Sequence, residues 1–515
     1  MIAPPAQTPS SQVQAQQEES ASALRIRVAA IFAEHRSRLI PTHSKEARAA
    51  RLYPMLYVGF ALPVILVLCF VSLPCFVPDE ANHLLRADQV SCGEVIGESA
   101  QGAEAGGQVD SGLLRLANGF SRLRNRWKAR YTGAAHPPAR ISLREFQSLE
   151  TIQWSGSAKW AGFGNTAIYP PTSYLPQAAG LWMGARFGLS VLHTIFLARL
   201  LTALCAMALG CWAIAICGSG RLLLAVVLLL PQTLYLYASM SQDAMLIAYT
   251  LCGLALVSRA VTESRLLSSS ELPLALCFFL MCAAARPPLL LLSAVLLLPP
   301  LCLRRTRRET LRTLGCLALL AAVTLAWSWR AKHLGPLTTW NGGNPPAQVI
   351  YVQHHLSQVP GIALHTIKAD WGKLLFSMIG CFGYLDTFLP GMAYPLFLEL
   401  LVAAVLLDSR RRRVRPALAL LVVASVAGVV AVMYALEYLI ATPPGGGHAL
   451  GMQGRYLLPL LPALGLLGVV LPRPREWGRP ALVLVLAGIV DLRLPLILAS
   501  EFYHQSLWGV LQMIW

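Results

Sequence analysis

Residues 55–83 read MLYVGFALPVILVLCFVSLPCFVPDEANH. Their first part, 55–77, contains no charged residue and is longer than the roughly 20 apolar residues that a membrane-spanning helix needs. Asp79, Glu80 and His83 follow it directly, so that a strongly apolar stretch ends at a group of polar side chains. This stretch predicts a membrane helix that delivers two carboxylates and an imidazole to the membrane surface.

The composition of the whole chain agrees with a membrane protein. Of 515 residues, 56% are apolar and only 13% are charged, whereas an ordinary soluble domain has about 25% charged residues. These values exclude a simple soluble protein. The net charge of +17 is compatible with a nucleic-acid-binding protein or with basic cytoplasmic loops, and the positions of the basic residues decide between the two.

Further apolar stretches of membrane length recur along the chain. We predict an all-α polytopic membrane protein with about 11 transmembrane helices. The predicted spans are 55–77, 193–217, 222–240, 244–258, 272–285, 287–303, 313–331, 390–407, 417–440, 456–471 and 480–500.

The predicted connections between spans are alternately rich and poor in basic residues. If the N-terminus is cytoplasmic, every second connection is basic, as expected for cytoplasmic loops. The predicted cytoplasmic segments, 1–54, 218–221, 259–271, 304–312, 408–416 and 472–479, contain 23 Lys and Arg against 9 Asp and Glu, or +14 of the +17. The charge therefore reflects orientation in the membrane and removes the nucleic-acid interpretation.

This orientation divides the chain into a cytoplasmic basic tail (1–54), a membrane domain (55–500) and a periplasmic C-terminal tail (501–515). The tail segment 24–39 fits an interfacial helix or a solvated basic tail equally well. Two large periplasmic loops are predicted, 78–192 and 332–389. The segment 174–191 is apolar enough for a twelfth span, but counting it would reverse the orientation, so we interpret it as a juxtamembrane helix.

Acidic residues at the predicted outer surface are the first candidates for chemistry. If a helix begins after Pro78, Asp79 and His83 share one face, with Arg86 close behind. Asp243 follows a Ser-Met-Ser-Gln segment between two later spans. The alternative in each case is a structural one, because carboxylates at helix starts also serve as N-caps.

The remaining candidates are aromatic or basic residues at the same surface. Tyr169 and Tyr174 lie in a Pro-rich segment that fits a sugar or lipid groove, although tyrosines also gather at membrane interfaces without a ligand. Arg286 and Arg455, the latter next to Tyr456, fit two-pronged phosphate binding or simple snorkelling. Asp386 lies in an outer Gly-Tyr-Leu-Asp segment.

Two weaker pairings remain, together with the question of a metal site. Cys92 and Cys381 both lie outside the predicted spans, where a disulfide is feasible. Asp491 lies inside the last span and is expected to pair with Arg493. No His or Cys spacing indicates a zinc site.

Six motifs, in order, resemble a known bacterial membrane family, the domain of unknown function 2142. They are PDEANH (78–83), NTAIYPPTSYLPQ (165–177), SMSQDAM (239–245), RPPLLLL (286–292), FGYLDTFLP (382–390) and TPPGGGHALGMQGRYLLPLLP (442–462). That family is similar to the GT-C superfamily of membrane glycosyltransferases. The resemblance, over about residues 55–470, implies a GT-C-like fold and sugar transfer from polyprenyl-phosphate donors at the outer face of the inner membrane.

The resemblance also implies roles for individual residues. It places the catalytic base at Asp79 or Glu80 and a second acid at Asp243. The expected substrate-binding residues are His83, Arg86, Tyr169, Tyr174, Arg286, Asp386, Arg455 and Tyr456. The expected partners are a polyprenyl-phosphate-linked sugar, a glycan or lipid acceptor and membrane lipid; no cofactor is demanded, and a divalent cation remains open.

Other functions remain as alternatives. A transporter or flippase of a lipid-linked saccharide needs ionisable groups along a path through the bilayer, whereas the candidates here gather on one side. A polysaccharide polymerase or ligase differs in donor length, and a non-catalytic assembly subunit would keep the acids as helix caps.

Overall fold

A computed structural model describes residues 45–99, 104–130, 139–303, 307–334, 339–408, 416–467 and 480–514. The chain divides into two units, 1–52 and 53–515. Apart from residues 45–52, every described helix and strand lies in the second unit. Outside the described residues lie residues 1–44 of the predicted basic tail, residues 304–306 and 409–415, and the whole predicted cytoplasmic segment 472–479.

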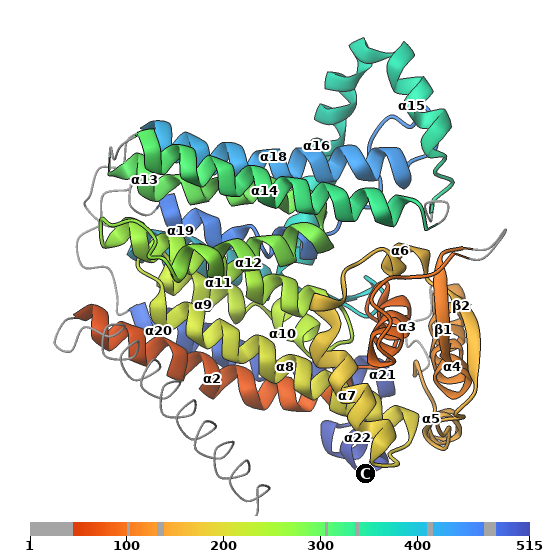
Figure 1. Ribbon diagram of the computed structural model, residues 1–515. Coiled ribbons are helices and arrows are strands. Elements are labelled where there is room, and N and C mark those ends of the chain that lie inside the picture. Colours follow the sequence, from red (N-terminus) through yellow and green to blue (C-terminus); the bar gives the residue numbers. More distant parts are fainter. Residues whose placement is uncertain are drawn as a thin grey trace, which may run out of the picture. The chain divides into compact units, whose positions relative to one another are not determined.

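Long apolar helices form the main body (Figure 1). Among the described residues, six helical segments are long and apolar enough to cross a membrane. They are α2 (Lys45–Val71), α8 (Val191–Ile216), α11 (Asp243–Thr262), α14 (Arg307–Lys332), α18 (Pro416–Ile440), and α20 with α21 (Pro480–Asp491 and Leu494–Tyr503). The membrane-protein prediction is confirmed to this extent, whereas the total of about 11 spans stays a prediction.

The other predicted spans are shorter or interrupted helices. Proline lacks an N–H group and disfavours helix in the preceding residue, so Pro231 divides 222–240 in two, and prolines likewise interrupt 287–303 and 456–471. The resulting elements are α9 (Arg221–Leu228), α10 (Pro231–Tyr237), α12 (Glu271–Ala285), η2 (Pro287–Leu297), α13 (Leu298–Cys302), α17 (Ala393–Asp408), η4 (Gly454–Leu457), η5 (Leu461–Ala463) and α19 (Leu464–Leu467).

The first large loop folds into short elements beside one end of the helical body (Figure 1). They are α3 (Glu80–Ser91), β1 (Gly106–Asp110), α4 (Ser111–Arg130), α5 (Leu143–Glu150), β2 (Ala158–Gly162), α6 (Gly164–Ala167), η1 (Pro171–Tyr174) and α7 (Leu175–Arg186). Strands β1 and β2 pair antiparallel, with Gln108 opposite Trp160. The helix α7 has 12 residues, which agrees with a juxtamembrane helix for 174–191.

The second large loop and the C-terminus add the remaining elements: α15 (Pro345–His354), η3 (Leu356–Gln358), α16 (Val359–Gly380), β3 (Cys381–Phe382), β4 (Thr387–Phe388) and α22 (Leu507–Ile514). Strands β3 and β4 form a second two-stranded antiparallel sheet. The all-α prediction therefore omitted two small sheets, although helices dominate the described residues.

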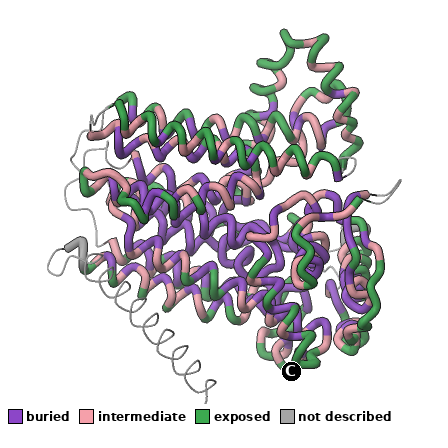
Figure 2. Tube along the Cα trace, in the orientation of Figure 1, coloured by how far each residue is buried: buried purple, intermediate pink, exposed green. Residues whose placement is uncertain are grey.

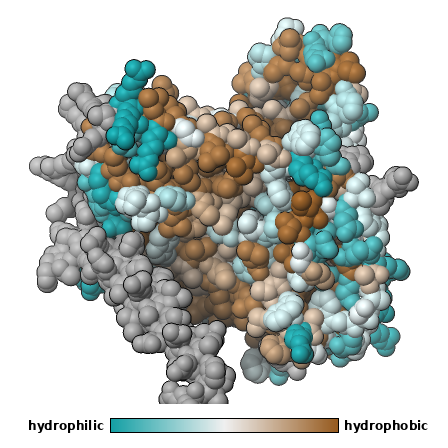
Figure 3. Space-filling view, viewed as in Figure 1, coloured by the Kyte–Doolittle hydropathy of each residue, from teal (hydrophilic) through white to brown (hydrophobic). Residues whose placement is uncertain are grey.

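Burial distinguishes an inner helix from outer ones. In the most apolar window of α11, 89% of the residues are buried, against 17% in α14 and 28% in α18. Figure 2 shows the same gradient, with buried residues at the centre and exposed ones along α14 and α18. The exposed side chains of these outer helices are largely apolar, and Figure 3 shows apolar side chains over the middle of the body. Such surfaces suit contact with lipid.

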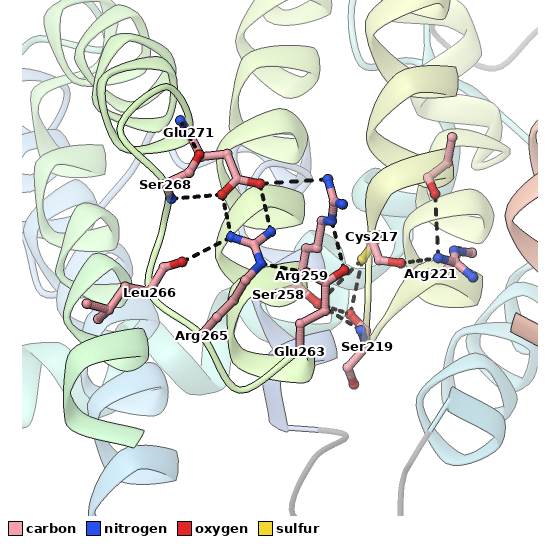
Figure 4. A network of polar contacts seen from close by, with 11 residues as sticks. Cys217, Ser219, Arg221, Ser258, Arg259, Glu263, Arg265, Leu266, Ser268 and Glu271 are labelled. Carbon is pink, nitrogen blue, oxygen red and sulfur yellow. Dashed lines mark hydrogen bonds and ion pairs between the residues drawn. The ribbon is translucent and has the colours of Figure 1, made fainter. Parts of the chain in front are cut away.

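A polar network closes the end of α11 that carries the predicted cytoplasmic arginines (Figure 4). Arg265 binds both carboxylate oxygens of Glu271, and Arg259 donates to Glu263 at 2.9 Å. Nearby, the Ser219 N–H donates to the Ser258 hydroxyl at 2.8 Å, which joins the segment after α8 to α11. At this connection between α11 and α12, Arg259 and Arg265 are thus each paired with a glutamate.

The turn from α2 to α3 is held by arginines from distant segments. Arg199 of α8 donates to the carbonyls of Cys69, Ser72 and Leu73 and, at 2.7 Å, to Glu80. Arg199 and the Glu80 side chain are essentially inaccessible to solvent, at 0% and 1% exposure. These contacts satisfy carbonyls at the C-terminal end of α2 that have no partner inside the helix.

Two predicted pairings are wrong. Cys92 and Cys381 are free thiols; Cys92 is exposed, whereas Cys381 is buried. Among the described residues, both carboxylate oxygens of Asp491 are buried without a hydrogen-bond partner, so the expected pair with Arg493 is absent. Arg493 instead occupies the N-cap position of α21 and is exposed.

The buried Arg199–Glu80 pair generates a stability prediction. Arg199→Gln leaves the Glu80 carboxylate buried without its cation, which typically costs about 3–5 kcal/mol. We expect a clear fall in the apparent melting temperature of the detergent-solubilised protein, measured by scanning fluorimetry. The control is Arg186→Gln, at an exposed arginine that ends α7. Equal melting temperatures for the two variants would contradict the prediction.

A second prediction concerns Asp88 on α3, which is 2% exposed and accepts the Asp110 N–H at 3.0 Å. Burial raises the pKa of Asp88 from 3.8 to about 6, and the neighbouring Asp110 charge adds to the rise. The folded state therefore binds this proton more tightly, and the associated stability is lost as pH rises from about 4 through 6.

Asp88→Asn removes the ionisation and retains an oxygen for the Asp110 N–H. We expect the stability of this variant relative to wild type to increase by about 1–3 kcal/mol between pH 4 and pH 7.5. Thermal melts of both proteins across this pH range measure the change. A pH-independent difference would show that Asp88 does not titrate as described.

Candidate functional site

Two carboxylates and two guanidinium groups from distant parts of the chain meet at one end of the helical body. Asp79 lies in the turn before α3, Asp243 begins α11, Arg286 follows α12 and Arg455 lies in η4. Arg455 Nη2 is 2.8 Å from Asp79 Oδ2, and its Nη1 is 3.4 Å from Asp243 Oδ2. Arg286 Nη2 is 2.8 Å from Asp243 Oδ1. Four of the six motifs thus contribute to one ion-paired cluster, here called the Asp–Arg cluster.

Asp79 is the accessible acid of this cluster. Its side chain is 36% exposed, against 3% for Asp243. It occupies the N-cap position of α3 in a left-handed conformation (φ 65°), but its side chain makes no capping hydrogen bond. Instead, the carboxylate faces Arg455 and the Asn165 amide, which donates to Oδ1 at 3.2 Å. Left-handed backbone is uncommon outside glycine and occurs at functional sites. The Asp79 side chain therefore does not serve as the helix cap that the sequence left as an alternative.

Glu80, the neighbouring acid, is in a different environment. Its Oε1 accepts from Arg199 at 2.7 Å and from the Met240 N–H at 3.0 Å, and its Oε2 accepts from the Val77 N–H at 3.3 Å. Both oxygens are therefore engaged within the protein and shielded from solvent. Of the two acids that the sequence left open, Glu80 has the geometry of a structural residue.

Aromatic rings surround the Asp–Arg cluster. The guanidinium carbons of Arg286 and Arg455 lie 4.5 Å and 5.3 Å from the ring centre of Tyr456, within cation–π range. His83 Nδ1 is 2.7 Å from the Tyr174 hydroxyl, and the His83 ring stacks on Tyr169. Burial lowers the pKa of His83 from 6.5 to about 4, so that the imidazole is neutral at neutral pH.

A cleft opens beside Asp79. It has a volume of about 360 Å³ and is lined by side chains of α3, α4, β2 and the β3–β4 turn. Asn82, Arg124, Trp160 and Tyr384 give it polar and aromatic walls, and the Arg124 guanidinium lies over the Tyr384 ring at 4.4 Å. Polar groups combined with flat aromatic rings are typical of sites that bind carbohydrate-like ligands.

Two predicted binding residues have structural roles elsewhere. Arg86 is fully buried and donates to the carbonyls of Val95 and Tyr169 at 2.7 and 3.0 Å, which fixes the loop. Asp386 binds Arg140 through both of its oxygens, at 3.2 and 2.9 Å. The sequence shows that each residue is charged and lies near a predicted membrane surface, but it does not show these internal partners. It therefore could not exclude either residue from the binding site.

Other residues of the site were not predicted. Asn165 was quoted only within a motif, and Trp160 lies on a strand that the sequence did not indicate. Arg124 lies in α4 between Arg122 and Arg126, which are both more exposed. Of these, only Asn165 carried a usable signal, because it begins one of the six motifs.

Within the described ranges, no three His, Cys, Asp or Glu side chains are grouped so as to hold a metal ion. Comparison with curated proteins finds no match, and comparison with solved structures finds none either. A family model covers most of the chain, including every residue of the Asp–Arg cluster. The chain belongs to the family described as predicted membrane protein (DUF2142), whose model matches residues 62–464.

Proposed function

We propose that this protein is a membrane glycosyltransferase. It transfers a sugar from a polyprenyl-phosphate donor to a glycan or lipid acceptor by a single inverting displacement. The observation that carries the proposal is the position of Asp79: a partly exposed carboxylate at the edge of a polar and aromatic cleft, paired with Arg455. The GT-C-like resemblance of the motifs supports the same chemistry.

In the proposed reaction, an acceptor hydroxyl in the cleft gives its proton to Asp79 while its oxygen attacks the anomeric carbon of the donor sugar. The bond between that carbon and the phosphate oxygen breaks, and the polyprenyl phosphate leaves with the electron pair. One base suffices, because a phosphate leaves without a protonating acid. Arg286 and Arg455 stabilise the negative charge that develops on the phosphate.

The site is proposed to face the periplasm from the inner membrane. Asp243 begins α11 and Arg259 lies near its other end, 16 residues later. At 1.5 Å per residue these groups are about 24 Å apart along the helix axis, most of the thickness of a bilayer core. Basic connections favour the cytoplasmic side, which leaves the Asp–Arg cluster outside. There the prenyl chain stays in lipid and its head group reaches the cluster.

The role of Asp79 is tested by Asp79→Asn, which keeps the side-chain shape and removes the base. We expect transfer to fall by about 10²–10⁴-fold. The variant stays folded, because Arg455 keeps its second ion-pair partner, Asp243. The assay follows consumption of radiolabelled polyprenyl-phosphate sugars by purified protein in the presence of envelope glycan and lipid fractions. Glu501→Gln, at an exposed acid of α21, is the control. Undiminished transfer by Asp79→Asn would exclude this residue as the base.

One observation favours the alternative proposal of a lipid-linked saccharide transporter. Asp491 lies inside the membrane-length segment 480–503, and its carboxylate has no partner among the described residues. Isolated acids within membrane helices occur in proton-coupled transporters.

Asp491→Asn separates the two functions. The glycosyltransferase proposal expects this variant to retain sugar transfer within about threefold, because Asp491 is not part of the Asp–Arg cluster. The transporter proposal expects instead that the wild-type protein moves labelled lipid-linked saccharide across the bilayer of vesicles and that the variant does not. Movement that depends on Asp491, without sugar transfer, would establish the transporter.

A further inference from the structure

Glu437 is a third carboxylate at the Asp–Arg cluster. It lies in the last turn of α18, and its strongest electrostatic interactions are with Arg286, Asp79 and Arg455. It also interacts with Tyr456, whose ring lies against both arginines. Yet among the described residues its Oε2 atom is buried without a hydrogen-bond partner. The carboxylate is therefore close to the cluster but is not satisfied by it.

The backbone opposite Glu437 makes room for this carboxylate. Gly451 has a φ of +99°, and a Cβ atom built on it would lie 2.4 Å from Glu437 Oε2. Any other residue at 451 would therefore both strain the backbone and displace the carboxylate. Gly451 thus leaves the space that Oε2 occupies beside the Asp–Arg cluster.

The neighbouring arginines also have unused hydrogen-bonding atoms. Arg286 Nη1 and Arg455 Nε are buried and have no acceptor among the described residues. An unsatisfied buried polar atom typically costs about 1–3 kcal/mol, so a concentration of them is expected where a ligand binds. A ligand that satisfies these buried atoms supplies acceptors to the two arginines and a donor to Glu437.

These requirements distinguish between ligand classes. The phosphate group of a lipid phosphate supplies mainly acceptors, and its charge repels Glu437 when that carboxyl group is ionised. A sugar attached to a phosphate supplies both the anionic oxygens and hydroxyl donors. We propose that Glu437 accepts a hydrogen bond from a hydroxyl group of the donor sugar while Arg286 and Arg455 bind its phosphate. Glu437 is then the residue that distinguishes a glycosylated lipid phosphate from the bare lipid phosphate; this rests on the proposed function.

The test compares binding of bare and glycosylated lipid phosphates to the purified protein in nanodiscs. One probe is fluorescent undecaprenyl phosphate; the others are undecaprenyl phosphates that carry one hexose or one pentose. Glu437→Gln keeps the shape of the side chain, Glu437→Ala removes it, and Glu501→Gln is the matched acid-to-amide control. We expect both Glu437 variants to raise Kd for the best-bound glycosylated lipid roughly tenfold and to leave Kd for undecaprenyl phosphate within about twofold.

Binding of the bare lipid also shows that each variant is folded. Wild type could bind both kinds of lipid while the Glu437 variants keep full affinity for both or lose affinity for both equally. In that case Glu437 does not contact the sugar, and the inference fails without the proposed function. If wild type binds neither lipid, the proposed glycosyltransferase function fails and the inference falls with it. Selective loss of the glycosylated lipid in both Glu437 variants, with the control unchanged, establishes the contact.

Discussion

The buried ion pair between Arg199 and Glu80 fixes the turn on which the site depends. The chain leaves the first membrane helix and must reverse into α3 within a few residues, with prolines at 74 and 78. Arg199, Arg124 and Arg455 each bind carbonyl groups of this segment, from three different parts of the chain. Their combined effect is to place Asp79 in a conformation that an isolated turn would not favour.

Charge balance explains why so many ionisable groups are tolerated at the membrane boundary. Asp79 and Asp243 neutralise Arg286 and Arg455, and Glu80 neutralises Arg199. Removing one partner would leave a buried charge, which is costly in a medium of low dielectric constant. The same pairing pre-orders the guanidinium groups, so little reorganisation is needed when an anion binds beside them. Glu437 is the exception, because the two arginines of the cluster are already paired with Asp79 and Asp243.

Hydropathy predicted the long helices well, because an uninterrupted apolar stretch has few alternatives in lipid. It failed where prolines divide a stretch, as at Pro231, and where strands are short and rich in small residues, as in β1 and β2. The sequence-based assignment of acids and arginines to one predicted surface was enough to identify the members of the Asp–Arg cluster. It could not separate Asp79 from Glu80, because adjacent residues at a helix start point in different directions and only their distant partners differ.

The same limit applies to Arg86 and Asp386. Their partners are loop carbonyls and Arg140, the latter 246 residues from Asp386 in sequence. A single sequence contains no information on such pairings, whereas the local pattern of charge at an apolar boundary is readable. Glu437 lay between these cases: its position near the end of a span was visible, but its significance depends on Gly451 and the two arginines.

The contact between Asp79 and Arg455 joins residues 376 positions apart. At synthesis rates of about 5–20 residues per second, the ribosome needs roughly 20–75 s to reach Arg455 after Asp79 has emerged. During that interval the acid lacks Arg455, and no complete cluster exists on the growing chain. The site is therefore assembled only when most of the protein has entered the membrane, and a chain truncated before η4 would insert helices without acquiring the Asp–Arg cluster.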